Sequence, residues 1–473
     1  MQDILPTFIT VTNPTGAEPV PDAALMNDTQ NLQIKVEPGK TYFLRIINIG
    51  AFAGQYFWIE GHTFRIIEVD GVYHEPAKAY QIYIAAAQRY GILLTTKNET
   101  GVNYAINGAM DQDLFDHVPD TLNPNVTSFL VYDSTAKMPT AAFLDAYDTF
   151  DDFNLVPTDG LELFENPQQF IILAVAMINL GNGANYAFFN DITYVKPSVP
   201  SLYTTLSTED LADNPSVYGS HTNTFVLGYQ QVIEIVVNNH DGGKHPFHLH
   251  GHNFQAIVRG ADDSGDYVPG NSTFPSVPMR RDTFMVRPNG HIVMRFQSDN
   301  PGVWLFHCHI EWHVDQGLIA TIVEVRCILD SPYNTVCAML TSLTQAPMAL
   351  QASLTVPKDH YAACAAANPP VATAGNAAAN TVALLDLTGQ PSPPAPLPAG
   401  FTPRGIVALV FSCIAAVLGL VAIGWYGMGE LSEAEKKREE AHVNERAARV
   451  HLVESSGTTA TGSEATVRGM GGN

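Results

Sequence analysis

Two histidine-rich stretches constrain this chain more than any other feature of its sequence. They are His245–His252, with the sequence HPFHLHGH, and Phe306–His313, with the sequence FHCHIEWH. The second stretch places one thiol between two imidazoles and a third imidazole shortly after them. A soft thiolate combined with imidazoles is typical of a copper electron-transfer site, which uses two His, one Cys and a weak axial position. The remaining imidazoles indicate a further metal beside the first.

Alternating hydrophobic residues fill most of the chain before residue 330 and predict β-structure. Phe64–Val69 and Val232–Val237 are typical runs, and turn residues separate such runs. This pattern indicates an all-β fold of Greek-key sandwich or barrel domains. We expect one domain over residues 1–145 and a second over 146–335. Both histidine stretches lie at strand ends of the second domain, where metal sites are commonly built.

The part after residue 335 predicts a membrane anchor. Residues 336–404 are expected to form an extension and a stalk. From residue 365 the sequence is rich in Ala, Pro, Asn and Thr, which indicates that this part is extended. Residues 405–428 carry no charge over 24 positions, enough to cross ~30 Å of hydrocarbon at ~1.5 Å per residue. Basic residues follow at Lys436–Arg438, so the tail, residues 429–473, is expected in the cytosol.

Charge and modification signals agree with an exported protein. The formal net charge is −23, which argues against nucleic acid as a partner and favours cations. Glycosylation sequons occur at Asn27, Asn98, Asn125 and Asn271, all before the apolar run. Cysteines at 327, 337 and 364 permit one disulfide with partners left open. No signal peptide opens the sequence, so we expect the natural N-terminus to be missing.

The two histidine stretches resemble the third and fourth copper signatures of multicopper oxidases. The similarity is greatest to fungal plasma-membrane ferroxidases of high-affinity iron uptake. It extends to Asn13–Pro19, Gln55–Glu60, Asn185–Asn190 and the single C-terminal span. The resemblance implies tandem cupredoxin-like domains followed by one transmembrane helix, with residues 1–145 corresponding to the family's second domain.

The resemblance also implies a role for each ligand. His245, Cys308 and His313 would bind the type 1 copper, with Leu318 at the axial position. Leu has no donor atom, so the copper potential should exceed that of a site with Met there. The other copper ions would be bound as follows: His248 for type 2, and His250, His307 and His309 for the type 3 pair.

The family builds its trinuclear cluster from eight histidines, four of them from two His-x-His pairs in an N-terminal domain. This sequence has no such pair before His248. We therefore expect a complete type 1 site and half of the trinuclear ligands, with the family's first domain missing. A fragmentary gene model or a shortened paralogue would both give this pattern. By itself, the chain as given should not reduce oxygen to water.

For the substrate, the resemblance implies Fe(II), oxidised to Fe(III) while O2 is reduced to water. Three carboxylates match the family's iron-binding positions: Glu18, Asp116 and Asp241. Hard carboxylate oxygens favour Fe(III), which lowers the iron potential. The pair Asp151 and Asp152 matches acidic residues that would pass Fe(III) to an iron permease. The expected location is the plasma membrane or, alternatively, the vacuolar membrane.

Two other functions compete with the ferroxidase. A laccase-like phenol oxidase would use a wider apolar pocket and usually lacks a membrane span, so the anchor and the carboxylates argue against it. A non-catalytic subunit for copper binding or permease assembly is favoured by the four missing histidines.

Overall fold

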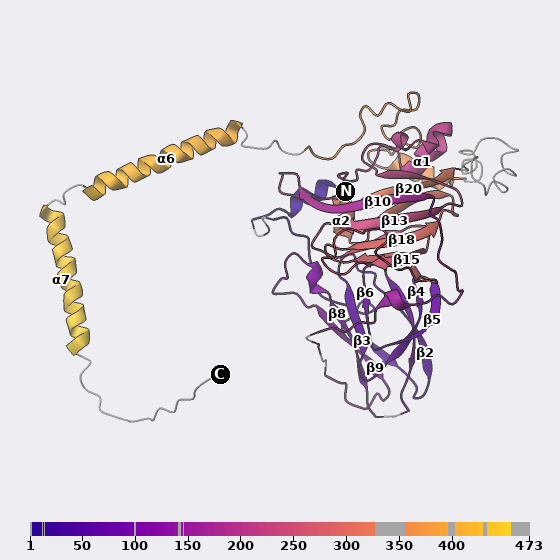
Figure 1. The fold of residues 1–473 in the computed structure, drawn as a ribbon. Helices are drawn as coiled ribbons and strands as arrows, with labels where there is room; N and C mark the ends of the chain where they lie inside the picture. The colour runs from indigo at the N-terminus through magenta and orange to yellow at the C-terminus, as the bar shows by residue number, and fades with distance from the viewer. Residues whose placement is uncertain are drawn as a thin grey trace. The chain divides into compact units, whose positions relative to one another are not determined.

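The computed structural model describes residues 2–11, 13, 15–98, 101–140, 143–144, 146–326, 355–395, 403–428 and 433–455. The chain divides into one compact unit of residues 1–397 and another of residues 398–473. Figure 1 shows that the first unit contains the described strands. Within it, we call residues 33–131 the first β region and residues 169–326 the second β region.

The first β region is built from two sheets. One has the strand order β1 (Gln33–Lys35), β9 (Asn125–Val131), β8 (Tyr104–Met110), β3 (Gln55–Ile59) and β6 (Gln81–Ile84). The other has the order β2 (Thr41–Ile47), β7 (Arg89–Thr95), β4 (Phe64–Val69) and β5 (Val72–Ala79). A short 3-10 helix, η2 (Gln112–Leu114), follows β8.

The second β region also has two sheets. The larger has the order β11 (Asn185–Phe189), β10 (Gln169–Asn179), β13 (Val232–Asn239), β18 (His291–Gln297), β15 (Phe254–Arg259) and β16 (Arg280–Arg281). The smaller has the order β12 (Thr224–Gly228), β20 (Ile319–Arg326), β19 (Gly302–Cys308), β14 (His245–Leu249) and β17 (Thr283–Val286). Besides η2, the described residues of the first unit form the short helices η3 (Asp152–Asn154), α1 (Ser201–Ser207), η4 (Glu209–Asp213), η5 (Pro215–Tyr218) and α2 (Glu311–Gln316). The short helix η1 (Gln2–Phe8) precedes them.

Strand periodicity explains how these sheets bury their inner faces. In β4, Phe64, Ile66 and Val69 are buried, whereas Arg65 between them is exposed. Successive side chains of a strand point to opposite faces, so one face of each sheet packs inward. The buried hydrophobic residues of both β regions form one continuous cluster. The predicted all-β fold of tandem sandwich domains is confirmed.

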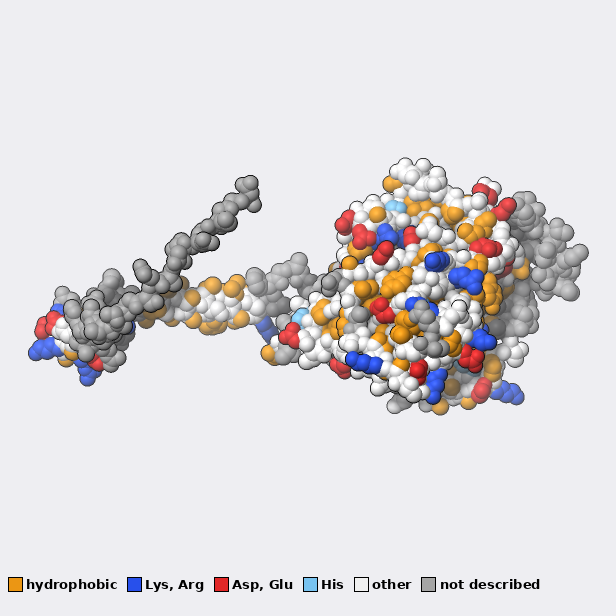
Figure 2. All heavy atoms as spheres, turned by 90° about the horizontal axis from the view of Figure 1, so that it is seen from below, with side chains coloured by type: hydrophobic (Ala, Val, Ile, Leu, Met, Phe, Trp, Pro, Cys, Tyr) orange, Lys and Arg blue, Asp and Glu red, His pale blue; other side chains and the backbone are white. Residues whose placement is uncertain are grey.

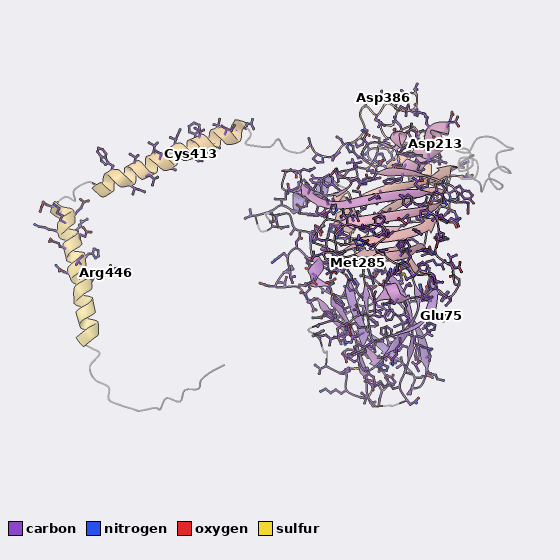
Figure 3. All side chains as sticks on the ribbon, viewed as in Figure 1. Glu75, Asp213, Met285, Asp386, Cys413 and Arg446 are labelled. Carbon is purple, nitrogen blue, oxygen red and sulfur yellow. The ribbon has the colours of Figure 1, made fainter. Side chains whose placement is uncertain are left out.

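A buried ion-pair network joins the two β regions. Arg281 is fully buried, and its Nε donates to Asp70 Oδ2 at 2.8 Å. It also pairs with Asp152 in η3. Nearby, Arg89 binds both carboxylate oxygens of Asp282, at 2.8 and 2.7 Å. Each of these arginine contacts joins residues from different parts of the chain, so they fix how the first sheet pair meets the second. Figure 3 labels Met285 of β17 in the same part of the molecule.

The described part after residue 354 differs from expectation within residues 365–404, the segment expected to be an extended stalk. A helix, α5 (Lys358–Ala366), begins the described part. Further on, Asn376 and Ala377 are buried against the second β region. The Ala377 amide donates to Val217 O at 2.9 Å, and the Ser198 amide donates to Ala377 O at 2.9 Å. The stalk prediction is therefore wrong here, because backbone hydrogen bonds attach this polar, Ala-rich stretch to the sandwich.

Within its described residues, the unit of residues 398–473 contains two helices. The helix α6 (Pro403–Met428) includes a segment, residues 404–425, that is long and apolar enough to cross a membrane. Cys413, labelled in Figure 3, lies within this segment. The helix α7 (Glu433–Ser455) is rich in charged residues. In the part of the chain that the structure describes, α6 is the one helix consistent with a single-pass membrane protein.

Candidate copper centre and acidic pocket

Strand pairing brings the two histidine stretches together. The strands β14 and β19 are antiparallel neighbours, with Phe247 opposite Cys308 and His248 opposite His307. The chain then turns through α2, which ends at Gly317 with a φ of 107°. A left-handed residue at this point favours glycine, because it has no Cβ to clash. The turn brings His313 back toward the strands that carry the other ligands.

Three side chains converge on one buried point. The Nδ1 atoms of His245 and His313 lie 3.0 Å apart, and Cys308 Sγ lies 3.2 Å from His313 Nδ1 and 3.8 Å from His245 Nδ1. Among the described residues, this is the one group whose three or more ligand atoms all lie within 4.8 Å of one another. Two imidazoles and one thiol are the donor set that suits a blue-copper ion.

The protonation of these groups is suited to binding a metal. Burial holds the pKa of His313 well below its ordinary value, so the imidazole is neutral. Burial likewise raises the pKa of the Cys308 thiol far above its usual range. Metal binding requires neutral imidazoles and a thiolate, and an ion at this point would displace the thiol proton. The residues present therefore fit a copper ion.

Leu318 lies beside this group, as expected for the axial position. Its amide donates to His313 O at 2.9 Å, and its carbonyl accepts from the Cys308 amide at 3.2 Å. The side chain is fully buried. Two backbone bonds thus hold an apolar residue against two of the three ligands, and the role of Leu318 in tuning the copper potential stays a prediction.

Four further imidazoles gather on the other side of β14 and β19, namely His248, His250, His307 and His309. Their neighbouring ring centroids lie 4.8 to 5.7 Å apart. The Nε2 atoms of His250 and His307 approach to 3.0 Å. Desolvation is the main cause that lowers the pKa of His250 to about 4 and that of His307 to about 3.

Two nitrogens of this cluster already have partners outside it. His248 Nδ1 lies 2.9 Å from Asp282 O, and His307 Nδ1 lies 2.7 Å from Cys308 O. Metal-binding histidines commonly use one nitrogen in this way and leave the other for the metal. The backbone carbonyl of Cys308 therefore connects the three-ligand group directly to a member of the four-imidazole cluster.

An acidic pocket of about 400 Å³ adjoins the three-ligand group and is lined by Glu18, Asp116 and Asp241, the three carboxylates expected to bind iron. Asp241 Oδ2 lies 3.1 Å from His245 Nε2, and Glu18 Oε1 lies 3.4 Å from His313 Nε2. Both carboxylates thus contact a candidate copper ligand directly. Asp116 is exposed and contacts neither imidazole in the described structure, but it faces the same pocket.

The two contacting carboxylates differ in their acidity. Burial raises the pKa of Glu18 to about 8, and the charges of Asp116 and Asp241 act in the same direction. Burial also disfavours ionisation of Asp241, but the hydrogen bond to His245 and the Gly243 amide outweigh it, and its pKa falls to about 2. Near neutral pH Asp241 is therefore ionised and Glu18 is mostly protonated, so a cation that binds in the pocket would displace the Glu18 proton.

Sequence reasoning missed two residues of this pocket, Gln316 and Lys244. Gln316 Nε2 donates to Glu18 Oε1 at 2.7 Å and so orients that carboxylate. Lys244 Nζ binds the buried Asp111 at 2.8 Å and lies 3.6 Å from Asp113, which is exposed at the pocket edge. The signals available were weak: Gln316 follows His313 by one helical turn, and Lys244 directly precedes His245.

The acidic pair Asp151 and Asp152 occupies a different setting from the one expected for passing iron onward. Arg259 pairs with both carboxylates, and Arg281 pairs with Asp152. Asp152 is buried. Since each carboxylate is bound to at least one arginine, the described geometry gives the pair a structural role in the network between the β regions.

Comparison with known proteins gives the family. Two models described as multicopper oxidase match residues 5–135 and 194–326. The iron transport multicopper oxidase fetC of Epichloe festucae is 54% identical over 439 residues, covering 92% of this chain and 67% of that protein. This chain belongs to the multicopper oxidase family. The predicted membership is confirmed.

Other multicopper oxidases support the same placement. The iron transport multicopper oxidase FET3 of Saccharomyces cerevisiae is 45% identical over 444 residues, covering 92% of this chain and 66% of that protein. The crystal structure of Fet3p, described as functioning in iron import, matches with a TM-score of 0.74 and 43% identity, over 84% of this chain and 72% of that one. The laccase of Botrytis aclada matches less well, with a TM-score of 0.55 and 25% identity, over 67% of this chain and 58% of that one. This multicopper oxidase spans about two thirds of the length of the curated relatives.

Proposed function

We propose that this multicopper oxidase takes one electron from Fe(II) in the acidic pocket, as a ferroxidase does. The observation that carries the proposal is the direct contact of Asp241 with His245 and of Glu18 with His313. Each carboxylate can bind iron in the pocket with one oxygen while its other oxygen contacts an imidazole of the three-ligand group. Iron bound in the pocket would therefore lie beside the proposed electron acceptor.

The carboxylates act on Fe(II) in two ways. They replace part of the water around a hard cation, which oxygen ligands suit better than the soft ligands of the copper group. They also stabilise Fe(III) more than Fe(II), because the higher charge gains more from each anionic oxygen. Copper held by His245, Cys308 and His313 would supply the acceptor for the electron. The bonds from Glu18 and Asp241 meanwhile fix the orientation of both imidazoles.

The apolar segment of α6 and the iron transport relatives extend this proposal. We infer that the chain is anchored in the plasma membrane by α6, with its β regions outside and α7 in the cytosol. An iron permease in the same membrane would receive the Fe(III). The basic residues after α6 support this orientation, because positive charge is retained on the cytosolic side.

A single-turnover measurement tests the iron site without requiring oxygen reduction. The full chain is loaded with copper and mixed with Fe(II) or with hydroquinone, and the loss of the visible thiolate-to-copper absorption is followed. Glu18→Ala combined with Asp241→Ala should slow reduction by Fe(II) on the order of 100-fold, at roughly tenfold for each carboxylate removed. Reduction by hydroquinone should stay nearly unchanged.

The matched control is Asp113→Asn, which removes an exposed carboxylate of the same pocket that contacts neither imidazole. Its Fe(II) rate should stay within about threefold of the parent, as for other exposed charges. Unchanged Fe(II) reduction in the double variant would show that the pocket is not the iron site. Preferential loss of hydroquinone reduction would favour the laccase-like alternative.

A further inference from the structure

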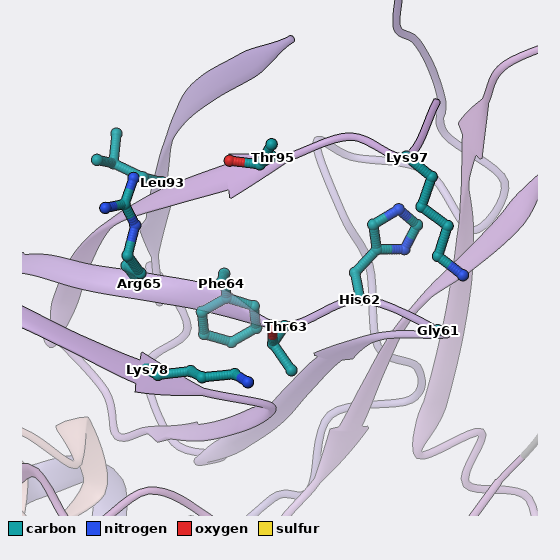
Figure 4. Close-up of a pocket in the computed structure, with 9 residues that line it drawn as sticks. All are labelled: Gly61, His62, Thr63, Phe64, Arg65, Lys78, Leu93, Thr95 and Lys97. Carbon is teal, nitrogen blue, oxygen red and sulfur yellow. The ribbon is translucent and has the colours of Figure 1, made fainter. Parts of the chain in front are cut away.

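A second pocket, unrelated to the copper ligands, lies on the outer face of the sheet β2-β7-β4-β5. It has a volume of about 410 Å³ and is open to solvent. Figure 4 shows the side chains that line it, drawn from β4, β5, β7 and the adjoining loops: Gly61, His62, Thr63, Phe64, Arg65, Lys78, Leu93, Thr95 and Lys97. Three of the nine residues are permanent cations, and none is acidic. Its volume lies in the range of small-molecule sites.

The first unusual feature is a pair of like charges in direct register. Arg65 on β4 lies opposite Lys78 on β5, and both side chains are exposed on the same face. Like charges placed directly opposite each other across antiparallel strands destabilise a sheet. On the other side of β4, Arg65 is opposite Leu93 of β7, which brings no compensating charge.

A third cation is held at the wall of the pocket. Lys97 Nζ lies 4.5 Å from the ring centroid of Tyr104, a cation–π contact that holds the ammonium in place. At Gly61, a Cβ atom would lie 3.1 Å from both Lys97 Nζ and Tyr104. The left-handed backbone of Gly61, with a φ of 64°, also disfavours any side chain there. The pocket therefore keeps the space around Lys97 open.

The neighbouring histidine supplies no negative partner. His62 Nδ1 lies 2.8 Å from Glu60 O, and its Nε2 lies 2.7 Å from Tyr132 Oη, so both ring nitrogens are engaged within the wall. Across the described parts of the chain, no carboxylate forms an ion pair with Arg65, Lys78 or Lys97. Three uncompensated cations in one hollow contrast with the whole chain, which has 47 acidic and 24 basic residues.

The surface around this part of the molecule does not share the excess of cations. Figure 2 looks onto the end formed by the first β region, and there basic, acidic and hydrophobic side chains are interspersed. On the same outer face, Arg45 of β2 lies 4.6 Å from the ring centroid of Phe43 and outside the pocket. The clustering of Arg65, Lys78 and Lys97 is thus a local feature of the hollow.

We propose that this pocket binds a small multivalent oxyanion, such as inorganic phosphate or a tricarboxylate. The planar guanidinium of Arg65 can donate two parallel hydrogen bonds to such a group. The two lysines add point charges from other sides, and the hydroxyls of Thr63 and Thr95 supply further hydrogen-bonding groups at the rim. The bound anion would relieve the repulsion between Arg65 and Lys78.

Thermal unfolding of the full chain in detergent tests this proposal, with inorganic phosphate, citrate and acetate added separately at equal ionic strength. Phosphate or citrate should raise the Tm in a saturable manner, whereas monovalent acetate should not. Arg65→Gln and Lys78→Gln should each weaken the apparent affinity roughly tenfold, the effect of one charge-assisted hydrogen bond. The better of the two anions identifies the preferred geometry.

A second readout separates anion binding from general destabilisation. Without added anion, Lys78→Gln should unfold about 1–2 °C higher than the parent, because it removes the repulsion with Arg65. Arg45→Gln is the matched control and should keep the anion-dependent shift of the parent. The proposal is overturned if neither anion gives a saturable shift, or if the shift is the same in Arg65→Gln and Lys78→Gln as in the parent.

Discussion

The two β regions share one construction and differ in what they carry at their strand ends. Both are pairs of sheets around a common core. In the second region, the paired strands β14 and β19 each bring a metal-binding stretch to the same edge. In the first region, the corresponding sheets carry a cationic pocket instead, while η2 and its loop contribute Asp113 and Asp116 to the acidic pocket.

The pair-of-sheets scaffold therefore does not by itself determine which kind of site a β region carries. The sandwich holds strands in register wherever alternating hydrophobic residues allow. Function then depends on how firmly the two regions are held together, because the acidic pocket draws residues from both. The ion-pair network around Arg281 is the structural feature that controls this junction.

The largest effect is expected from Arg281→Met. It removes the buried guanidinium that bonds Asp70 and Asp152 and leaves both carboxylates with fewer partners. Removing one partner of a buried ion pair costs about 3–5 kcal/mol, so the free energy of unfolding should fall by that amount. Denaturant unfolding followed by fluorescence measures the change.

The neighbouring Arg280→Met provides the control, because Arg280 pairs with the exposed Asp159. Exposed pairs contribute up to about 1 kcal/mol. Equal decreases for Arg281→Met and Arg280→Met would show that the junction between the regions does not depend on the buried network.

The second prediction concerns acid stability at the same junction. Burial by itself raises the pKa of Asp152, but the charges of Arg259 and Arg281 outweigh it and hold the pKa below its ordinary value. A lowered folded pKa contributes stability that is complete above the unfolded pKa of about 3.9 and is lost as pH falls through the folded pKa. The free energy of unfolding should therefore decrease from roughly pH 5 downward.

Asp152→Asn should remove part of that pH dependence while lowering stability at neutral pH. The adjacent Asp151→Asn is the control, since the side chain of Asp151 is about half exposed, at 49%. It should keep the slope of the parent. Parallel curves for the parent and Asp152→Asn between pH 5 and pH 2 would contradict the assignment of this acid sensitivity to Asp152.

The sequence indicated the candidate ligands far better than their surroundings. His245 and the His307–His309 stretch stand out because their local spacing suits copper chemistry, and strand pairing brings the two stretches together. Glu18 could be placed only through family resemblance, because its partner Gln316 lies 298 residues away. No local pattern links Asp70 to Arg281, which are 211 residues apart.

The error over the stalk has a related physical cause. Residues rich in Ala and Pro are expected to be extended because they have little hydrophobic surface to bury. In the structure, Asn376 is buried with Ala377, and its side-chain nitrogen donates to the carbonyls of Leu384 and Asp386. Stability here comes from hydrogen bonds within the stretch and to the sandwich surface, which composition does not reveal. Residues 327–354, including Cys327 and Cys337, lie outside the described residues.

The smallest effect is expected from Lys244→Met in the acidic pocket. There, the lysine of the second β region contacts acidic residues of the first. Lys244 offsets the charges of Asp111 and Asp113, and its side chain is 22% exposed. Its removal should lower the concentration of Fe(II) needed for half-maximal reduction of bound copper by about two- to fivefold at low ionic strength, as expected for one charge across a solvated pocket. Asp111 keeps its hydrogen bonds from Tyr83 Oη, at 2.8 Å, and from the Asp113 amide, at 3.3 Å, so its carboxylate stays held in place.

Two further measurements, the salt dependence and a second lysine variant, distinguish a local effect of Lys244 from an effect of net charge. The gain should shrink as ionic strength rises toward physiological values, because solvent ions screen charges over about 8–10 Å. Lys78→Met makes the same change in net charge within the first β region but outside the acidic pocket. If both substitutions changed the Fe(II) requirement equally, the cause would be net charge alone. A response confined to Lys244→Met would instead locate iron next to the carboxylates of both regions.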